Sequence, residues 1–356
     1  MKPFRVGLYG CGGRTTQIVE KALRSGVAQV TLCHDINPKR AELLAKEYGG
    51  KVCPLEELLE SKSVDMLLIS LFPAAHPGAL LGSIGSGKPI YIEKPVAVFM
   101  EDIRRLAPLV GKGYVHVGLF YRYIPVFRML ASLVESGKIG ELVGINFNWL
   151  CNSFEPGKGM EENPNWRVRP ETGGELTQHY CHAFEWFRQL GGDFESILAM
   201  SSKVHDNKSC VEDIWDLIIK QRNGCQISFH SSERNPKYTV SGYLEGTNGS
   251  LEWEWNQPST ITYFQGLHQR SAGEAIHVPD EAPDALEEFI ARFKSGAPPA
   301  VSLEDGLWSV LPPVYARESV RTGTLQSFPT SLQQRQEMGS GHLAAPTTAA
   351  DRPSIF

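Results

Sequence analysis

The first 120 residues of the chain alternate short apolar runs with amphipathic stretches. The apolar runs predict strands at residues 4–9, 29–34, 66–70, 90–92 and 114–118. The amphipathic stretches predict helices at residues 16–24, 38–47, 55–60 and 77–86. Strands that alternate with helices indicate βαβ units, which build a doubly wound parallel sheet with helices on both faces. The run 64–71 is nearly all apolar, as a strand buried on both faces should be.

The pattern changes after residue 121. A helix is predicted at residues 124–135 and a strand at 142–149, followed by a long loop at 151–170 and a helix from 173 to about 190. Further strands are predicted at residues 196–203, 214–221, 225–230, 238–245, 250–255 and 260–264. Asn223-Gly224 and Asn248-Gly249 lie between strands and are typical of hairpin turns. This pattern predicts an α/β region with a large open, mostly antiparallel sheet, completed by helices at residues 284–294 and 303–321.

Composition argues against several classes of partner. The net charge of −5 gives no reason to expect nucleic acid or an anionic membrane as a partner. No apolar run approaches the length of a membrane span, and no leader-like segment precedes the first strand. The seven cysteines contain no CxxC pair, which favours reduced thiols. We therefore predict a cytoplasmic protein.

A glycine-rich segment, Gly10-Cys11-Gly12-Gly13-Arg14, joins the first predicted strand to the first predicted helix. This is the context that the dinucleotide-binding turn of a Rossmann domain requires. Gly10 permits the tight turn, and Gly12 lets the backbone approach a pyrophosphate at the helix N-terminus. Thr15 stands where the usual motif has its third glycine, so we expect looser packing between helix and strand there.

Asp35 ends the second predicted strand, 25 residues after Gly10. Its carboxylate would accept hydrogen bonds from an unphosphorylated ribose and repel a 2′-phosphate, which favours NAD over NADP as the cofactor. Lys39 and Arg40 lie nearby and would weaken that preference. In the alternative interpretation, the glycines form a plain turn and Asp35 caps the helix that begins at Pro38.

Lys94 ends the run Lys88-Pro89-Ile90-Tyr91-Ile92-Glu93-Lys94-Pro95. A lysine at a strand end, fixed before a proline, is poorly placed for general solvation and well placed for acid–base chemistry. Together with the glycine turn upstream and His182 downstream, it favours a dehydrogenase.

These segments occur in the order found in the glucose–fructose oxidoreductase / inositol dehydrogenase family (Gfo/Idh/MocA), which the chain resembles from about residue 4 to residue 321. The resemblance implies a Rossmann domain at residues 1–120 and a substrate-binding and oligomerisation domain at 121–330, whose open sheet covers the cofactor. Residues 331–356 are polar and rich in Gly, Ala, Thr and Pro, and are predicted to form a disordered tail. The shared pieces are Gly10-Cys11-Gly12, Asp35, residues 64–65, Ser70, His76, residues 87–89 and 93–95, Gly118, Arg122, residues 173–176 and His182.

The resemblance also implies where the cofactor lies and how subunits associate. It places Glu93 at the nicotinamide ribose and Lys94 beside nicotinamide and substrate, with a cis Lys94–Pro95 peptide bond. It implies a homodimer or homotetramer formed through the exposed sheet face. The residues predicted to bind the cofactor are Gly10, Cys11, Gly12, Gly13, Arg14, Asp35, Arg40, Ser70, His76, Glu93 and Lys94.

Hydride transfer from a secondary alcohol needs a group that removes the hydroxyl proton. We predict His182 for that role because its ordinary pKa suits it, and Lys94 for holding the developing alkoxide. The alternative for His182 is a core histidine satisfied by a backbone carbonyl. Where the family commonly has aspartate, four residues before this histidine, the chain has Gln178, which can hydrogen-bond but cannot exchange a proton. Some branches carry Glu-Gln where this chain has Gln178-His179, so we keep Gln178 in the catalytic set.

Other residues are predicted to contact the substrate. Trp166 and Arg167 match a Trp-Arg pair of the family, and an aromatic face with a cation suits a sugar. His179, Cys181 and His182 are not expected to bind a metal, because Cys181 points to another helix face and no other ligand cluster is visible. The predicted substrate-binding residues are Arg122, Tyr123, Trp166, Arg167, Gln178, His179 and His182.

The leading hypothesis is an NAD-dependent oxidoreductase that acts on a secondary hydroxyl or ketone of a sugar, glycoside or cyclitol. The first alternative is an enzyme that keeps NAD tightly bound and runs a redox-neutral elimination or glycoside cleavage. The second is a non-catalytic NAD-dependent sensor, against which the presence of both Lys94 and His182 argues.

Overall fold

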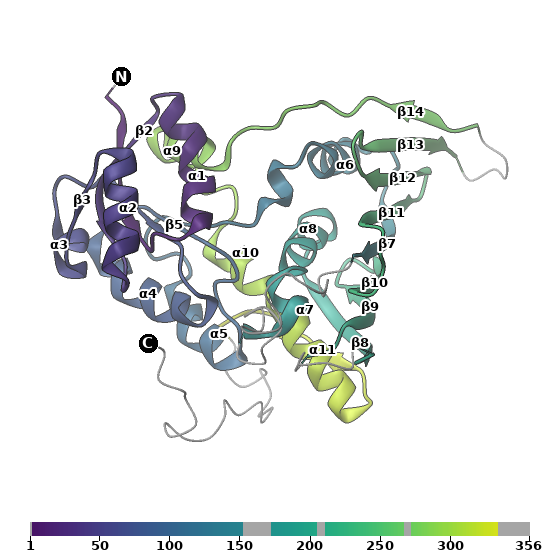
Figure 1. Ribbon diagram of the computed structural model, residues 1–356. Helices are drawn as coiled ribbons and strands as arrows, with labels where there is room; N and C mark the ends of the chain where they lie inside the picture. Colours follow the sequence, from purple (N-terminus) through teal and green to yellow (C-terminus); the bar gives the residue numbers. More distant parts are fainter. Residues whose placement is uncertain (1, 152–171, 205–210, 267–271, 334–356) are drawn as a thin grey trace.

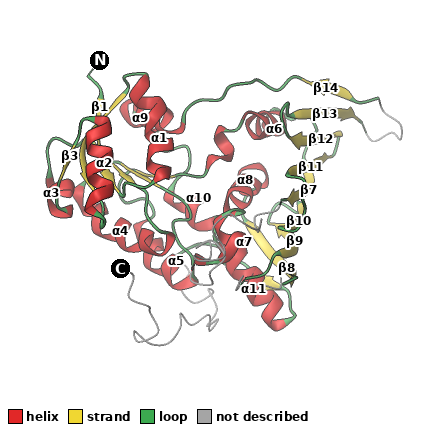
Figure 2. Ribbon diagram, in the orientation of Figure 1, coloured by secondary structure: helices red, strands yellow, loops and turns green. Residues whose placement is uncertain are grey.

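The computed structural model describes residues 2–151, 172–204, 211–266 and 272–333. Two sheets with their covering helices make up these residues (Figures 1 and 2). The amino-terminal sheet has six parallel strands, and the carboxy-terminal sheet has nine strands that are mostly antiparallel. The predicted α/β fold class is therefore confirmed.

The first sheet has the strand order β3-β2-β1-β4-β5-β6. The order reverses between β1 and β4, so their carboxyl ends border the crevice in which sheets of this kind bind ligands. Every residue of β4 and β5 is buried, as the apolar run predicted. The strands are β1 (Phe4–Tyr9), β2 (Ala28–His34), β3 (Lys51–Val52), β4 (Met66–Ile69), β5 (Ile90–Ile92) and β6 (Val115–Val117).

Helices connect these strands, and local side chains define where they begin and end. The side chain of Asn37 caps the first turn of α2, and Gly49 ends that helix with φ +79°. The strand β3 was not predicted, because two residues carry too little periodicity, and the helix α5 was missed. The helices are α1 (Gly13–Arg24), α2 (Pro38–Tyr48), α3 (Leu55–Glu60), α4 (His76–Ser83) and α5 (Met100–Leu106).

The second sheet has the order β14-β13-β12-β11-β7-β10-β9-β8-β15, in which β7 and β10 are parallel neighbours. Both predicted hairpins are confirmed, since Asn223-Gly224 joins β9 to β10 and Asn248 precedes β12 in the turn from β11. The strands are β7 (Leu142–Leu150), β8 (Phe194–Ser202), β9 (Ile214–Gln221), β10 (Gln226–Ser232), β11 (Thr239–Gly246), β12 (Gly249–Trp255), β13 (Thr260–Gln265), β14 (Glu274–Ile276) and β15 (Gln326–Ser327).

One face of the second sheet is packed against helices. Figure 1 shows α6 (Pro125–Glu135), α8 (Cys181–Gly191) and α11 (Leu311–Thr322) on the same side of it. Aromatic rings fill this interface: Phe147 stacks on Phe229 at 5.7 Å, and Trp186 of α8 meets Trp253 at 5.8 Å. Among the described residues, no helix covers the opposite face.

The chain returns to the first sheet near its end. Helix α9 (Ala285–Ser295) buries Phe289 against Tyr91 and Tyr114, with ring centroids 5.9 and 5.6 Å apart. Leu286 and Ile290 belong to the same buried cluster as β1, α1 and β2. The amino-terminal core is therefore completed by a segment far along the chain, and the predicted boundary at residue 120 stays a prediction.

Two of the predicted helices are each divided in two. Residues 303–321 form α10 (Leu303–Trp308) and α11, because Pro312 and Pro313 lack the N–H groups that a continuous helix would use. Residues 173–190 form α7 (Gly174–Gln178) and α8, and the break between them lies beside Lys94. The predicted loop at 151–170 and the predicted tail lie almost entirely outside the described residues.

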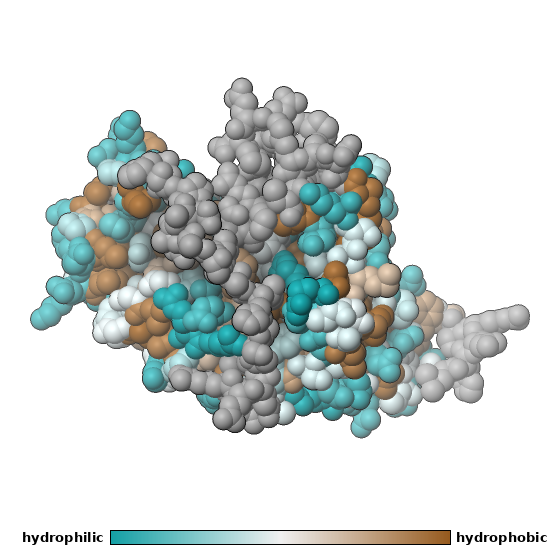
Figure 3. All heavy atoms as spheres, turned by 90° about the horizontal axis from the view of Figure 1, so that it is seen from below, coloured by the Kyte–Doolittle hydropathy of each residue, from teal (hydrophilic) through white to brown (hydrophobic). Residues whose placement is uncertain are grey.

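No helix in the ranges described combines the length and the apolarity that crossing a bilayer would take. On the face seen in Figure 3, hydrophilic and hydrophobic side chains of the described residues are mixed.

Candidate active site

The turn between β1 and α1 has the geometry that a bound dinucleotide requires. Gly10 has φ +95°, and a Cβ at this position would lie 2.1 Å from the carbonyl oxygen of Ser70. Glycine is therefore needed where β1 passes the end of β4. A Cβ built at Gly12 or Gly13 meets nothing within 4 Å, so the space at the N-terminus of α1 is open. This turn fits a pyrophosphate.

Thr15 takes the place of the third glycine without loosening the turn. Its side chain is fully buried, and its hydroxyl group donates to the carbonyl oxygen of Gly10 at 2.8 Å. The expectation of looser packing is wrong, because the hydroxyl stabilises the turn that it was expected to disturb.

The carboxylate of Asp35 faces the glycine turn. Its Oδ2 accepts from the backbone N–H of Cys11 and its Oδ1 from that of Asn37, each at 2.7 Å. The cap of α2 is Asn37, which accepts from Lys39 N–H at 3.1 Å, so the alternative in which Asp35 caps this helix is not observed. Ile36 is 95% exposed beside this carboxylate, an apolar surface next to the predicted ribose position.

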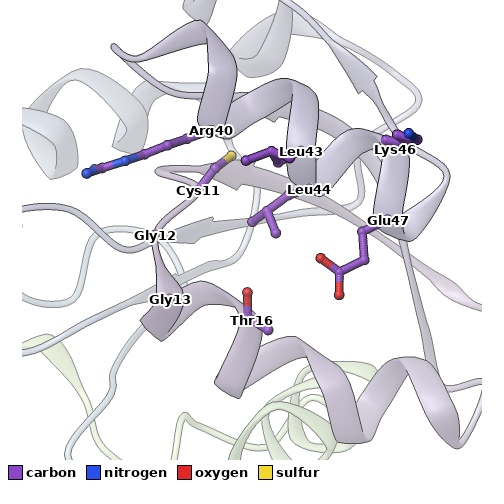
Figure 4. Close-up of a pocket in the computed structure, with 9 residues that line it drawn as sticks. All are labelled: Cys11, Gly12, Gly13, Thr16, Arg40, Leu43, Leu44, Lys46 and Glu47. Atoms are coloured by element: carbon purple, nitrogen blue, oxygen red, sulfur yellow. The ribbon is translucent and has the colours of Figure 1, made fainter.

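A cavity of about 560 Å³ opens beside the glycine turn, between α1 and α2 (Figure 4). It brings Arg40 of α2 near Cys11, Gly12 and Gly13, four residues that were predicted to bind the cofactor. Two cations and one carboxylate are among its lining residues, which are Cys11, Gly12, Gly13, Thr16, Arg40, Leu43, Leu44, Lys46 and Glu47.

Glu93 and Arg14 form an ion pair at the carboxyl end of β5. Arg14 Nε lies 3.1 Å from Glu93 Oε1, and Glu93 Oε2 accepts from the backbone N–H of Lys94 at 3.2 Å. A Cβ at Gly118 would lie 2.8 Å from Glu93 Oε1, so the glycine leaves room for this carboxylate. The pair thus links the glycine turn to the strand end that carries Lys94.

His76 fixes the backbone around Lys94 from the other side. Its Nε2 accepts from Leu71 N–H at 3.2 Å, so its Nδ1 carries the proton and donates to the carbonyl oxygen of Pro95 at 2.8 Å. Burial lowers the pKa of this fully buried ring and keeps it neutral. The Lys94–Pro95 peptide bond is cis, as the family resemblance implied.

Lys94 points at the break between α7 and α8. In a continuous helix, His182 N–H would bond to the carbonyl of Gln178, but here it bonds to that of His179 at 3.4 Å. The released Gln178 carbonyl accepts from Lys94 Nζ at 2.5 Å. The side chain of Gln178 is buried and donates from Nε2 to the carbonyl of Thr172. Gln178 therefore meets the lysine through its main chain.

His182 is fully buried beside Lys94. Its Nδ1 accepts from the backbone N–H of Phe120 at 3.2 Å, and its ring lies 4.0 Å from the ring of Phe120 and 5.5 Å from that of Tyr121. The alternative in which a backbone carbonyl satisfies the ring is not observed, and Nε2 has no partner among the described residues. Burial, and then the charges of Lys94 and His179, hold the pKa of His182 well below its ordinary value.

His179 has a different environment. Its Nδ1 lies 2.8 Å from Oε2 of Glu175, a buried carboxylate one turn earlier in α7. Its ring lies 5.1 Å from that of Trp149 and is one-third exposed, at 34%. Across the described residues, no group of three side chains could hold a metal ion, and Cys181 directs its thiol to the Gln178 carbonyl at 3.7 Å.

The structure does not bring all predicted substrate residues to this point. The guanidinium of Arg122 is paired with the buried carboxylate of Glu185, with Nε 2.7 Å from Oε1. Tyr123 packs against His116, with centroids 6.2 Å apart. Trp166 and Arg167 lie outside the described residues. Their roles stay predictions.

Three site residues had not been predicted. Ile36 follows the predicted Asp35 in the sequence, and Glu175 contacts the predicted His179. Glu175 and His179 are one helical turn apart, and this spacing could have indicated their contact. Arg317 of α11 donates to Thr177 Oγ1 at 3.1 Å and to the carbonyl of Gly173, and so holds α7. No local pattern could have indicated Arg317, because its partners lie more than 130 residues away.

Comparison with known proteins agrees with this architecture. The model of the oxidoreductase family with an NAD-binding Rossmann fold matches residues 4–120, and the GFO/IDH/MocA C-terminal domain matches residues 127–252. The 1,5-anhydro-D-fructose reductase of Ensifer adhaerens is 25% identical over 346 residues, which cover 92% of this chain and 99% of the relative. The inositol 2-dehydrogenase of Rhizobium meliloti (strain 1021) is 24% identical over 319 residues, or 85% and 92% of the two chains.

Solved structures share the fold. Levoglucosan dehydrogenase, in complex with NADH and L-sorbose, superposes with a TM-score of 0.80 at 18% identity, over 92% of this chain and 100% of the other. An oxidoreductase domain protein from Kribbella flavida gives a TM-score of 0.81 at 17% identity, over 92% and 100% of the two chains.

The two glycines of the turn predict two different losses. Gly12→Ala should leave the melting temperature within about 2 °C of the parent but weaken NAD binding at least about tenfold, because its Cβ enters open space that the pyrophosphate needs. Gly10→Ala should destabilise the fold itself by about 1–3 kcal/mol through its strained φ. Calorimetric NAD titration and thermal unfolding measure both. Gly82→Ala, in open space on α4, is the matched control, and unchanged NAD affinity in Gly12→Ala would contradict the placement.

Proposed function

The chain belongs to the Gfo/Idh/MocA family of oxidoreductases, and we propose that it moves a hydride between a nicotinamide cofactor and a secondary hydroxyl or ketone of a sugar or cyclitol. The observation that carries this proposal is the position of Lys94. Its ammonium group stands at the carboxyl end of β5, bonded to the Gln178 carbonyl and close to His182. A fixed cation at this place suits an oxygen that gains negative charge.

The cofactor would be held by residues on the rim of the first sheet. When bound, the nicotinamide ring accepts or gives the hydride. The open turn at Gly12 and Gly13 would take the pyrophosphate, and Asp35 would accept hydrogen bonds from the adenosine ribose. Ile36 would cover one face of the adenine, since burial of so exposed an apolar side chain is favourable.

Lys94 would contribute charge and position at the reacting oxygen. As an alcohol is oxidised, its oxygen acquires negative charge, and as a ketone is reduced the same charge appears before the proton arrives. An ammonium group already held by a carbonyl needs little reorganisation to donate to that oxygen. The proton itself needs a partner, and the candidates are His182 and His179, which lie three residues apart at the break between α7 and α8 and affect each other electrostatically.

A sugar or cyclitol is supported by the chemistry around Lys94. Imidazole and ammonium groups lie beside aromatic rings, and the ring of His182 is parallel to that of Tyr121 within 16°. Polar groups that fix hydroxyls and aromatic faces that pack on C–H groups suit such substrates. The names of the relatives, an anhydrofructose reductase and an inositol 2-dehydrogenase, point the same way.

A cytoplasmic location is part of the proposal. Five buried cysteines form no disulfide bond: Cys11, Cys33, Cys53, Cys181 and Cys225. Such use of cysteine fits a reducing compartment.

Turnover tests the function directly. Incubation with NAD and a panel of sugars, anhydrosugars and inositols should form NADH in step with oxidised product, measured by absorbance and mass spectrometry. Lys94→Met should lower kcat at least about a hundredfold with little change in NAD affinity, because it removes the charge at the oxygen. Lys88→Met is the control, since that ammonium bonds to the Leu59 carbonyl. Product without net NADH would support the redox-neutral alternative instead, and full turnover by Lys94→Met would refute the site.

The preference for NAD over NADP should depend on Asp35. Its carboxylate would repel a 2′-phosphate, whereas Arg40 and Lys46, which line the cavity beside the glycine turn, would attract one. Asp35→Ser should therefore shift the affinity ratio towards NADP by about tenfold or more, or about 1.4 kcal/mol. Titration with both cofactors measures the ratio. Glu47→Gln, which removes the carboxylate that lines this cavity, should leave the ratio unchanged, and a parent that prefers NADP would contradict the assignment.

We propose that the uncovered face of the second sheet binds a second copy of the chain. Leu198 and Ile218 are partners in adjacent strands, and both are exposed on this face together with Met200. Exposed apolar side chains in register are typical of an interface between subunits.

Ile218→Lys should convert the dimer or tetramer into a smaller species, because it buries an unpaired charge in the interface. Size-exclusion chromatography with light scattering gives the mass. Val52→Lys, at the far edge of the first sheet, should keep the parental mass. A parent that is monomeric at micromolar concentration would contradict this proposal.

A further inference from the structure

The two histidines at the break between α7 and α8 hold their protons on opposite nitrogens. A backbone N–H can only donate, so the nitrogen that faces it must carry a lone pair. Phe120 N–H points at Nδ1 of His182 from 3.2 Å, which leaves the single proton of the neutral ring on Nε2. Nδ1 of His179 lies 2.8 Å from Glu175 Oε2; the contact is not aligned as a hydrogen bond, but a carboxylate oxygen this close favours an N–H over a lone pair on the nitrogen that faces it. The lone pair of His179 is therefore on Nε2.

We propose that His182 is a permanently neutral Nε2–H donor that holds the substrate oxygen, and that His179 exchanges the proton of that oxygen. This division rests on the proposed oxidoreductase function and names the acid–base group of the same site. In the oxidation direction, the hydroxyl proton passes to His179 Nε2 while the carbon gives its hydride to the nicotinamide. The imidazolium that forms carries one positive charge opposite the Glu175 carboxylate. Reduction returns the proton from the same nitrogen.

The surroundings of His182 allow it to donate a hydrogen bond but not to take up a second proton. Protonation would put a second N–H on Nδ1, directly against the N–H of Phe120. The charged groups that face the ring are Lys94 at the end of β5, Arg14 on α1 and His179 at the start of the break, and each of them disfavours a further positive charge. The Nε2–H has no partner among the described residues, although the ring is fully buried. A donor held in this way is available only to a ligand.

Exposure and charge favour His179 as the proton carrier. Its side chain is 34% exposed, so the proton it gains can leave to solvent, whereas His182 has no exposed surface. Glu175 is itself buried, and its Oε2 lies 2.8 Å from Nδ1, so this carboxylate orients the ring of His179. This arrangement of base and orienting carboxylate is well suited to general acid–base catalysis.

Nuclear magnetic resonance of the 15N-labelled imidazole rings tests the tautomers without any substrate. We expect the ring nitrogens of His182, assigned by their loss in His182→Gln, to show protonated Nε2 and unprotonated Nδ1 without titrating between pH 5 and 9. Phe120→Pro removes the backbone N–H at the first position of a short helical turn, where proline is tolerated, while Phe120→Ala removes the same ring but keeps the N–H. His182 should titrate, or change tautomer, in the proline variant only. Titration of His182 in the parent would overturn the proposal.

Turnover then separates the two roles. His182→Gln keeps an N–H donor and should retain kcat within about tenfold of the parent, whereas His182→Ala should lose about a hundredfold. His179→Gln should lose about a hundredfold or more and flatten the acidic limb of the pH profile of kcat/KM, which His182→Gln should keep. His277→Gln, on an exposed residue after β14, is the control. Equal loss in His182→Gln and His182→Ala, or an unchanged acidic limb in His179→Gln, would overturn the division of roles. If the parent turned over no substrate, the proposed function would fail while the resonance experiment still decided the tautomers.

Discussion

The bond between the Lys94 ammonium group and the Gln178 carbonyl connects the two sheets of this protein where chemistry is expected. The lysine is placed by a parallel strand whose carboxyl end opens at the crevice of the first sheet. The carbonyl is available only because the helix breaks after Gln178 and His182 N–H turns to His179. In a continuous helix this carbonyl would already accept from His182 N–H and would be less open to the lysine. The break is thus the feature that lets one half of the molecule hold the lysine of the other.

Charge balance explains the residues around this bond. Lys94 and Arg14 bring two cations to a partly enclosed region, and Glu93 offsets them from the side of the first sheet. On the side of the second domain, Glu175 contributes the buried carboxylate beside His179. His182, which lies between these groups with no carboxylate partner in the described residues, can remain there only as a neutral ring.

Much of this could be predicted where a signal is local. The glycine turn, Asp35 and the strand ending in Lys94 each depend on a few neighbouring residues, and their positions follow from βαβ topology. The return of α9 to the first core could not be predicted, because its amphipathic pattern does not say which sheet it covers. The packing of Thr15 was predicted wrongly, since its hydroxyl finds the Gly10 carbonyl only in three dimensions. The tautomer of His182 could not be predicted for the same reason, because it depends on the backbone N–H of Phe120, which is distant in the sequence.

The substitution at position 178 now has a structural explanation. An aspartate there is common in the family, and in this chain the position holds an amide whose side chain is buried against the Thr172 carbonyl. A carboxylate could not donate that hydrogen bond, so Gln178 stabilises the start of α7 and leaves no acid in its usual place. Glu175, three residues earlier, places a carboxylate next to His179 instead. In the proposed division of roles, the acid–base group is His179, one residue further along, and Glu175 supplies the carboxylate that position 178 lacks.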